Sequence, residues 1–128
     1  MGLILVVDDE LDGGRLLERV LTASDHKVVA LADRDQALQW LQGHTPDLVL
    51  LDIKIRGGSG MSVLQHLHAY LPATEVVVIT GYPSAETRST AQQYGVKEYW
   101  TKPIELDELE KRVNELLKVR LDSKQSQQ

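Results

Sequence analysis

Five chemically active side chains stand at the ends of short apolar runs in the sequence. They are Asp8, Asp9, Asp52, Thr80 and Lys102. In a doubly wound parallel sheet all strands point the same way, and ligands bind beyond their carboxyl ends. If the apolar runs are such strands, these side chains converge on one edge of the sheet. The sequence therefore predicts a site at that edge, with three carboxylates in a small volume.

The residue types of this predicted site favour phosphoryl chemistry. Like charges at such a range disfavour full ionisation and raise at least one pKa unless a cation is present. Mg²⁺ is a hard cation that binds through one or two carboxylates plus water and phosphate oxygens. Lys102 adds a positive charge suited to a phosphate, and Thr80 adds a hydroxyl donor. This set suits an acyl phosphate, which forms when a carboxylate attacks phosphorus while cations neutralise the equatorial oxygens.

Apolar runs and segments of helical periodicity alternate along the chain and would position these side chains. Strands are predicted at Leu3–Val7, Lys27–Leu31, Asp47–Leu51, Glu75–Ile79 and Val96–Trp100, and helices near residues 11–23, 34–42, 60–71, 84–94 and 105–119. Four of the five strands are almost continuously apolar at their centres, as expected for strands covered on both faces. Strict alternation predicts a single α/β domain with one doubly wound, five-stranded parallel sheet and five helices.

The predicted helix over residues 84–94 differs from the others. Its sequence, SAETRSTAQQY, contains no Leu, Ile, Val or Met, only small apolar residues and Tyr94. Such a helix buries little apolar area, so we expect it to dock more weakly than its neighbours. It is either a short surface helix or a mobile functional element.

Length, charge and composition exclude several classes of protein. The 128 residues predict one domain, and their formal charge of 14 − 19 = −5 argues against nucleic-acid binding by charge alone. The absence of cysteine excludes a disulfide scaffold, a thiol nucleophile and a Cys-ligated zinc site. The sequence contains no apolar stretch long enough to span a membrane and no signal-peptide pattern at its start. We therefore expect a cytoplasmic protein without membrane contacts.

Four motifs together resemble those of a bacterial two-component response-regulator receiver domain, of the chemotaxis-receiver type. They are VVDDE at 6–10, Asp52 closing LVLLD, ITGY at 79–82 and WTKP at 100–103. The resemblance covers about residues 3–119 and implies a flavodoxin-like strand order, 2-1-3-4-5. It predicts a receiver domain over residues 1–121, followed by a polar tail or truncated linker over 122–128.

The resemblance also implies roles for the residues at the acidic edge. Asp52 would be the phosphoacceptor and one of the metal-site residues. Asp9 would bind Mg²⁺ directly, Asp8 would support the ion through water, and the backbone carbonyl of Lys54 would complete the metal site.

The remaining implied roles concern the phosphoryl group and the response to it. Thr80 would hydrogen-bond the phosphoryl group, and Lys102 would pair with it. Tyr99 matches the aromatic residue that the family turns inward when the threonine shifts, so it is the predicted switch residue. The Lys102–Pro103 bond resembles the family's cis peptide.

The sequence departs from the family pattern beside the phosphoacceptor. Arg56 stands where the family often has proline four residues after the phosphoacceptor, and Gly57 and Gly58 follow it. Lys54 and Tyr82 stand two residues after Asp52 and Thr80, at positions that influence dephosphorylation in this family. We hypothesise that this bulky pair screens the attacking water and lengthens the phosphorylated lifetime.

The resemblance implies a phosphorylation-controlled switch in a two-component phosphorelay, and a regulatory domain rather than an enzyme. A histidine kinase or phosphotransfer protein would phosphorylate Asp52 with Mg²⁺. The surface formed by 84–94, 96–100 and 105–119 would then change to control an output domain or target protein, or to form a homodimer. The chain has no basic recognition helix, so we expect no direct nucleic-acid binding. The motifs at 79–82 and 100–103 also resemble receivers of AAA+ enhancer-binding regulators.

Other functions fit parts of the pattern. A haloacid-dehalogenase-type phosphohydrolase also uses Asp, Thr, Lys and Mg²⁺, but it needs Asp-x-Asp where this chain has adjacent Asp8 and Asp9. A flavodoxin-like cofactor binder needs a Ser/Thr/Gly-rich phosphate loop after the first strand, where this chain is acidic. A receiver-like interaction module that is never phosphorylated is a third alternative. Taken singly, the aspartates and Thr80 could also be helix-cap or turn residues.

Overall fold

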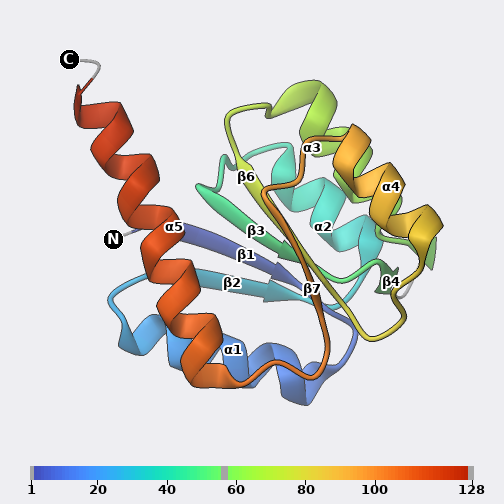
Figure 1. Cartoon of the computed structure of the whole chain (residues 1–128), viewed down its shortest axis with the longest axis horizontal. Coiled ribbons are helices and arrows are strands. Elements are labelled where there is room, and N and C mark those ends of the chain that lie inside the picture. Colours follow the sequence, from blue (N-terminus) through green and yellow to red (C-terminus); the bar gives the residue numbers. More distant parts are fainter. Residues whose placement is uncertain (1, 56–57, 127–128) are drawn as a thin grey trace.

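The computed structural model describes residues 2–55 and 58–126 and contains the predicted α/β architecture within them (Figure 1). The main sheet consists of β1 (Leu3–Val7), β2 (Lys27–Leu31), β3 (Leu48–Leu51), β6 (Glu75–Thr80) and β7 (Glu98–Thr101). The helices are α1 (Leu11–Ala23), α2 (Arg34–Leu41), α3 (Met61–Tyr70), α4 (Ala85–Gln93) and α5 (Leu106–Ser126). The strands are parallel in the order β2-β1-β3-β6-β7, which confirms the predicted order 2-1-3-4-5.

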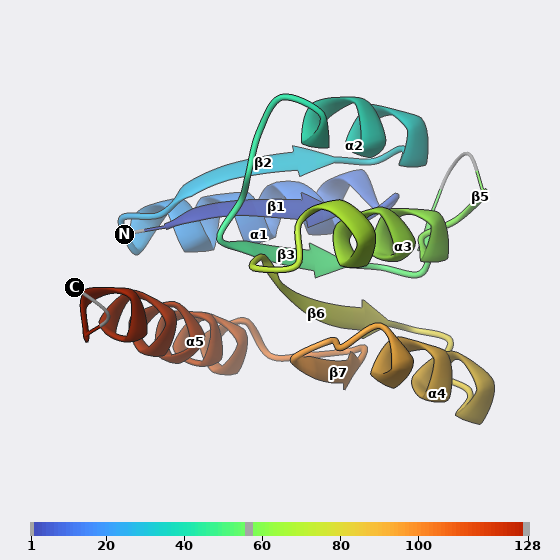
Figure 2. The same cartoon turned by 90° about the horizontal axis from the view of Figure 1, so that it is seen from above.

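The helices cover both faces of the sheet, as Figure 1 shows, and Figure 2 shows the order of the strands across it. Alternate residues of a strand point to opposite faces. Leu5 and Val7 therefore pack in the core under α2, α3 and α4, whereas Ile4 and Val6 pack in the core under α1 and α5. Covering both faces is what requires the strand centres to be apolar throughout.

The register of the central strands brings their carboxyl ends to the same level. Val7 of β1 is aligned with Leu51 of β3, and Leu51 is aligned with Val78 of β6. The ladder continues for one residue, because the Asp52 amide donates to the Val7 carbonyl at 2.8 Å. The residues that follow β1 and β3 are thereby held side by side.

The structure corrects the predicted start of the last strand. β7 begins at Glu98, two residues later than the predicted start at Val96. Gly95 adopts a φ of +73° after α4, and the Val96 amide still bonds to the Ala91 carbonyl of that helix. Glycine is favoured at such a left-handed position. Val96 is therefore part of the helix termination, which sequence periodicity does not reveal.

Two further differences lie outside the predicted elements. α5 continues to Ser126, so most of the segment expected to be a polar tail is helical. The predicted end of the domain at residue 121 remains a prediction. A small antiparallel pair, β4 (Lys54–Ile55) and β5 (Gly58–Ser59), follows β3 and was not predicted. The departures at Arg56 and Gly57 lie outside the described residues.

In the described part of the chain, no helix combines the length and the apolar character that crossing a membrane requires.

Gly60 closes the segment after Asp52 by a very tight backbone approach. Its amide donates to the Ile53 carbonyl at 2.5 Å. A Cβ at this position would collide with the backbone oxygen of Asp52 and lie 3.0 Å from the Cα of Ile53. Because backbone atoms cannot give way as a flexible side chain does, this position requires glycine.

We expect Gly60→Ala to lower the free energy of unfolding by about 1–3 kcal/mol, the usual cost of overpacking. Urea denaturation measures the change. Gly43→Ala is the matched control, because a Cβ there meets no atom within 4 Å, and it should leave stability unchanged or raise it by about 0.4–1 kcal/mol. Equal effects of the two substitutions would contradict the steric explanation.

Candidate functional site

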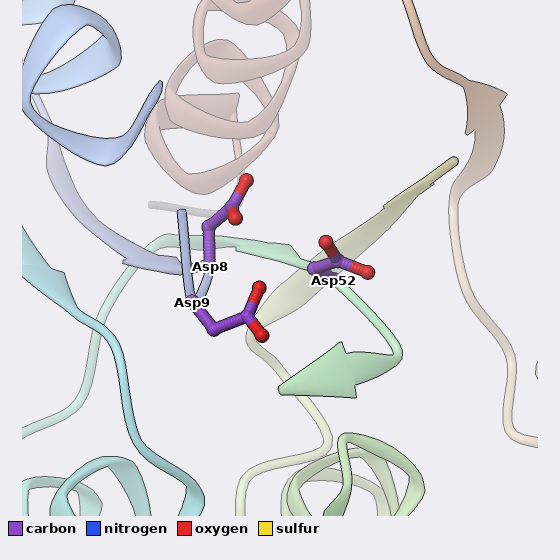
Figure 3. Close-up of side chains that lie close together, drawn as sticks. All are labelled: Asp8, Asp9 and Asp52. Atoms are coloured by element: carbon purple, nitrogen blue, oxygen red, sulfur yellow. The ribbon is translucent and has the colours of Figure 1, made fainter. Parts of the chain in front are cut away.

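Asp8, Asp9 and Asp52 gather at the carboxyl ends of β1 and β3 (Figure 3). Each offers one carboxylate oxygen, and these oxygens lie within 4.8 Å of one another. Asp8 and Asp52 are buried, with 8% and 6% of their surfaces exposed, and Asp9 is half-buried. The predicted convergence of the three acids is therefore confirmed, and their oxygens could hold a divalent cation.

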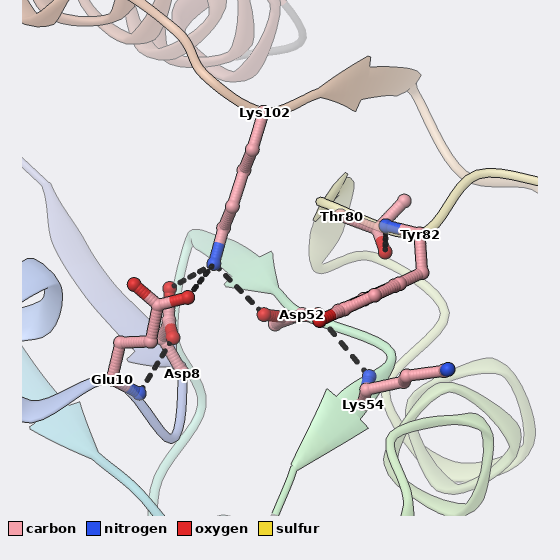
Figure 4. Close-up of polar contacts among 7 residues, drawn as sticks. All are labelled: Asp8, Glu10, Asp52, Lys54, Thr80, Tyr82 and Lys102. Atoms are coloured by element: carbon pink, nitrogen blue, oxygen red, sulfur yellow. Dashed lines mark hydrogen bonds and ion pairs between the residues drawn. The ribbon is translucent and has the colours of Figure 1, made fainter.

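Lys102 crosses the edge of the sheet from the segment after β7 and contacts this cluster (Figure 4). Its Nζ donates to Asp8 Oδ2 and to Asp52 Oδ2, both at 2.9 Å. The same ammonium lies 3.8 Å from a carboxylate oxygen of Glu10, which is largely exposed. One ammonium group thus offsets two buried carboxylates and one exposed carboxylate. The Lys102–Pro103 peptide bond is cis, as the resemblance implied.

Backbone amides two residues downstream orient three of the site's side chains. The Glu10 amide donates to Asp8 Oδ1 at 2.9 Å, and the Lys54 amide donates to Asp52 Oδ1 at 3.1 Å. The Tyr82 amide donates to Thr80 Oγ1, also at 3.1 Å. These are the local side-chain bonds of turn-forming residues. The turn interpretation is therefore confirmed, and it is compatible with the predicted site, because each turn fixes the direction of a side chain.

One carboxylate of the cluster has a raised pKa, as the sequence predicted, but burial rather than like charge is the main cause. Burial raises the pKa of Asp52, and the hydrogen bond from Lys102 only partly offsets this effect. Burial by itself would lower the pKa of Lys102, but its hydrogen bonds to Asp52 and Asp8 outweigh this and raise its pKa. Asp52 is therefore less readily ionised than an exposed aspartate, and it gains from any additional cation.

Asp9 is the carboxylate of the cluster that remains available. Both oxygens of Asp8 and of Asp52 accept hydrogen bonds. Among the described residues, the Asp9 carboxylate has no hydrogen-bond partner. Its position beside Asp52 in Figure 3 makes it suitable as a metal ligand.

Lys54 and Tyr82 come together at the rim of the site. Lys54 Nζ lies 4.2 Å from the centroid of the Tyr82 ring, a cation–π arrangement. Tyr82 is 68% exposed, and Lys54 is also exposed. Figure 4 shows both side chains on the same side of Asp52, away from Lys102. The sequence analysis proposed that these two residues act as a pair, and the structure shows that they contact each other.

Tyr99 lies in β7, half-buried, and its ring packs against the core under α2, α3 and α4. Its hydroxyl is 2.9 Å from Thr87 Oγ1 of α4. The predicted switch residue is therefore directed toward α4 in this structure, while Thr80 is fully buried at the end of β6.

An open groove of about 520 Å³ adjoins the acidic edge. Asp8, Glu10 and Lys102 lie at its polar end, and apolar side chains of α1 and α5 line much of the rest. Leu16 of α1, 44% exposed, is part of this lining. A ligand or partner could approach the site along this groove.

Three residues with a part in the site were not found from the sequence. Glu10 could have been found, because it adjoins Asp8-Asp9 and approaches Lys102. Gly60 and Thr87 gave no local signal, because their importance lies in contacts with residues that are distant in the chain or in backbone conformation. The role implied for the Lys54 carbonyl stays a prediction.

Comparison with known proteins gives a consistent result. A family model described as the response regulator receiver domain matches residues 4–114. The transcriptional regulatory protein ZraR of Escherichia coli is 33% identical over 107 residues, which are 84% of this chain and 24% of ZraR. Sporulation initiation phosphotransferase F of Bacillus subtilis is 30% identical over 114 residues, covering 89% of this chain and 92% of that protein.

The fold comparison agrees with the sequence comparison. The CheY-like response regulator receiver domain protein from Methanospirillum hungatei superposes with a TM-score of 0.91 at 24% identity, over 96% of this chain and 98% of that one. The chain spans about a quarter of the length of ZraR, so it corresponds to one part of that regulator. Since the family model covers most of the chain, this protein belongs to the response regulator receiver domains of two-component signalling.

Proposed function

We propose that this chain is a phosphoacceptor switch in which Asp52 receives a phosphoryl group from a histidine kinase or phosphotransfer protein. The observation that carries the proposal is the environment of Asp52. Its carboxylate is 6% exposed, one oxygen accepts from a backbone amide, and the other accepts from Lys102 Nζ. A carboxylate held in this way beside two further acids is oriented for attack on phosphorus.

The transfer step follows from these groups. An oxygen of ionised Asp52 attacks the phosphorus of a phosphohistidine, the new P–O bond forms, and the P–N bond breaks with its electron pair leaving on the imidazole. Lys102, already 2.9 Å from Asp52, shifts to the transferred phosphoryl oxygens. Thr80 donates its hydroxyl hydrogen to the same group. Both contacts stabilise charge that is concentrated in the transition state and product.

The acidic cluster supports a Mg²⁺ site in the same place. Asp9 would bind the ion directly, Asp8 through water, and Asp52 and the Lys54 carbonyl would complete the protein ligands. When bound, Mg²⁺ supplies charge neutralisation for the carboxylates and the phosphoryl oxygens. The closeness of the three carboxylates supports this assignment, since their oxygens lie within 4.8 Å of one another. Burial raises the pKa of Asp52, so a nearby cation would favour its ionised form.

The open groove beside Lys102 supports docking of the phosphodonor. Its apolar lining suits a protein partner, and its polar lining includes Lys102, which bonds to Asp52. A regulatory domain without a turnover reaction needs only transient access of this kind. We place this exchange in the cytoplasm.

The proposed output surface consists of α4, β7 and α5. A second open groove, of about 800 Å³, lies along β7 and α5 and is lined by Trp100, Ile104 and several acids. A phosphoryl group adds a charge of roughly −1.5 to −2. Thr80 and Lys102 move toward the phosphoryl group. Tyr99 and the weakly packed α4 then rearrange. The result is a population shift between two states.

What this surface binds depends on the complete protein. ZraR is named a transcriptional regulatory protein, and this chain matches about a quarter of it. That likeness supports an output domain that controls transcription. Formation of a homodimer on phosphorylation would then pass the signal to that domain. Sporulation initiation phosphotransferase F, matched over 92% of its length, supports instead a free-standing phosphorelay carrier.

Asp52→Asn is expected to abolish phosphorylation. After treatment with acetyl phosphate and Mg²⁺, intact mass should show one added phosphoryl group on the wild type and none on the variant. Asp35→Asn, at an exposed acid of α2, is the control and should behave as the wild type. Equal labelling of Asp52→Asn would contradict the assignment. Continued turnover of an added phosphate monoester would favour the phosphohydrolase instead.

Stability in metal-free buffer should depend on pH through Asp52. Because its native pKa lies above the ordinary 3.8, protonated Asp52 contributes stability that is complete below that value and is lost as pH rises through the native pKa. The stabilisation by Asp52→Asn relative to wild type should therefore grow as pH rises above the ordinary pKa of 3.8 and through the native pKa. Urea titrations with EDTA measure the difference in free energy of unfolding between Asp52→Asn and the wild type. Added Mg²⁺ should reduce this difference at pH 7. A difference that shrinks with rising pH would be the wrong sign.

Lys54→Ala and Tyr82→Ala should each shorten the phosphorylated lifetime. The cation–π pair would shield the acyl phosphate from water, and its loss is expected to speed phosphate release about two- to fivefold. Decay of the phosphorylated mass gives the rate. The controls are Lys27→Ala, at the opposite end of the sheet, and Tyr70→Ala, whose ring is 72% exposed on α3. Unchanged or slower release in the two test variants would disprove the shielding role.

A further inference from the structure

Two contacts join Tyr99 of β7 to the first turn of α4. The Tyr99 hydroxyl lies 2.9 Å from Thr87 Oγ1. The guanidinium carbon of Arg88, the next residue, lies 4.5 Å from the centroid of the Tyr99 ring. Both contacts come from consecutive residues of one helical turn, so Tyr99 and this turn are held together.

Thr87 also forms the N-terminal cap of α4. Its amide donates to Ser84 Oγ at 3.1 Å, and the Ser84 amide donates to Thr87 Oγ1 at 3.2 Å, which is a reciprocal capping box. The Thr87 hydroxyl hydrogen can donate to the Ser84 carbonyl at 3.2 Å. The same oxygen also lies 2.9 Å from Ser84 Oγ and 2.9 Å from the Tyr99 hydroxyl, and in both contacts either oxygen can be the donor. One oxygen atom therefore links the cap of α4 to the tyrosine.

The rest of α4 does little to hold the helix in place. All of its residues are described, and among them only Ala91 is buried. At its far end the ring of Tyr94, the C-cap residue, meets the His68 ring edge-on, with centroids 5.3 Å apart. Because little apolar area is buried, polar contacts at the first turn have a large share in fixing its position.

The same turn is connected to the proposed phosphorylation site by the chain itself. Thr80 Oγ1 accepts from the Tyr82 amide, and Ser84 follows two residues after Tyr82. A movement of Thr80 is therefore transmitted toward Ser84 along a segment of four residues. The Tyr99–Thr87 contact resists that movement from the side of β7.

We propose that Thr87 is a positioning residue that holds Tyr99 against α4 and thereby sets the balance between the two states of the switch. The Tyr99–Thr87 hydrogen bond must break when Tyr99 leaves α4, so this bond favours the unphosphorylated arrangement. This inference rests on the proposed function for its role in signalling. The contact itself can be tested without phosphorylation.

Amide hydrogen exchange over residues 84–90 of the unphosphorylated chain tests the contact. Tyr99→Phe keeps the capping box and removes only the phenol, and it should speed exchange about three- to tenfold, as the loss of one hydrogen bond does. Thr87→Val should speed exchange at least as much, because it also weakens the cap. Thr87→Ser keeps the hydroxyl, so its amide exchange should be as slow as in the wild type.

Two comparisons separate this positioning role from simple helix destabilisation. Thr90→Val removes a hydroxyl of the same helix that bonds only within α4, to the Glu86 carbonyl, and it should leave the Tyr99→Phe effect intact. In a Thr87→Val background, Tyr99→Phe should have no further effect, since the phenol acts through Thr87. The proposal is wrong if the effects of Thr87→Val and Tyr99→Phe on the exchange rate multiply in the double variant. It is also wrong if Tyr99→Phe alone leaves the exchange rate unchanged.

Phosphorylation then tests the link to signalling. With acetyl phosphate and Mg²⁺, the wild type should show a change in α4 exchange that Thr87→Val already shows in part before phosphorylation. The response of Thr90→Val should match the wild type. If intact mass shows no phosphoryl group on Asp52, the proposed function fails while the exchange data still decide the contact. If Asp52 is phosphorylated and Thr87→Val responds like Thr90→Val, Thr87 does not set the balance.

Discussion

The confinement of three carboxylates to one edge of the sheet is the constraint on which the site depends. The parallel register puts Asp8, Asp9 and Asp52 side by side, and Lys102, from the segment after β7, pairs with Asp8 and Asp52. Burial raises the pKa of Asp52, and the hydrogen bond from Lys102 only partly offsets this effect. Additional positive charge at this edge would therefore favour the ionised form of Asp52.

The rigidity of the sheet contrasts with the loose packing of α4. The central strands are buried on both faces, so the positions of Asp8 and Asp52 are set by two hydrophobic cores. In α4, by contrast, Ala91 alone is buried, and a shared hydroxyl at Thr87 joins the helix to Tyr99. Under the proposed function, a change of charge at the rigid edge would move the weakly held helix, because that response costs the least packing.

Local turn chemistry and function coincide in this protein. Asp8, Asp52 and Thr80 each accept a hydrogen bond from the amide two residues downstream. Such bonds are ordinary at strand ends, which is why each residue alone is a weak sign of function. They become informative together, because the turns direct the three side chains into one region of the molecule.

The sequence by itself determined the alternation of strands and helices, the acidic edge and the bounds of β1 and α1, whereas the predicted strand order came from the family resemblance. Apolar strands that alternate with helices can bury both faces of a sheet in few ways, and parallel strands are the expected arrangement. The carboxyl ends of parallel strands then lie at the same edge of the sheet. Tertiary structure alone decided the start of β7 after Gly95, the requirement for glycine at Gly60, and the contacts of Lys54 with Tyr82 and Tyr99 with Thr87. These features arise where segments distant in the chain approach, or where the backbone takes a special conformation. Periodicity and residue type carry no information about such distances.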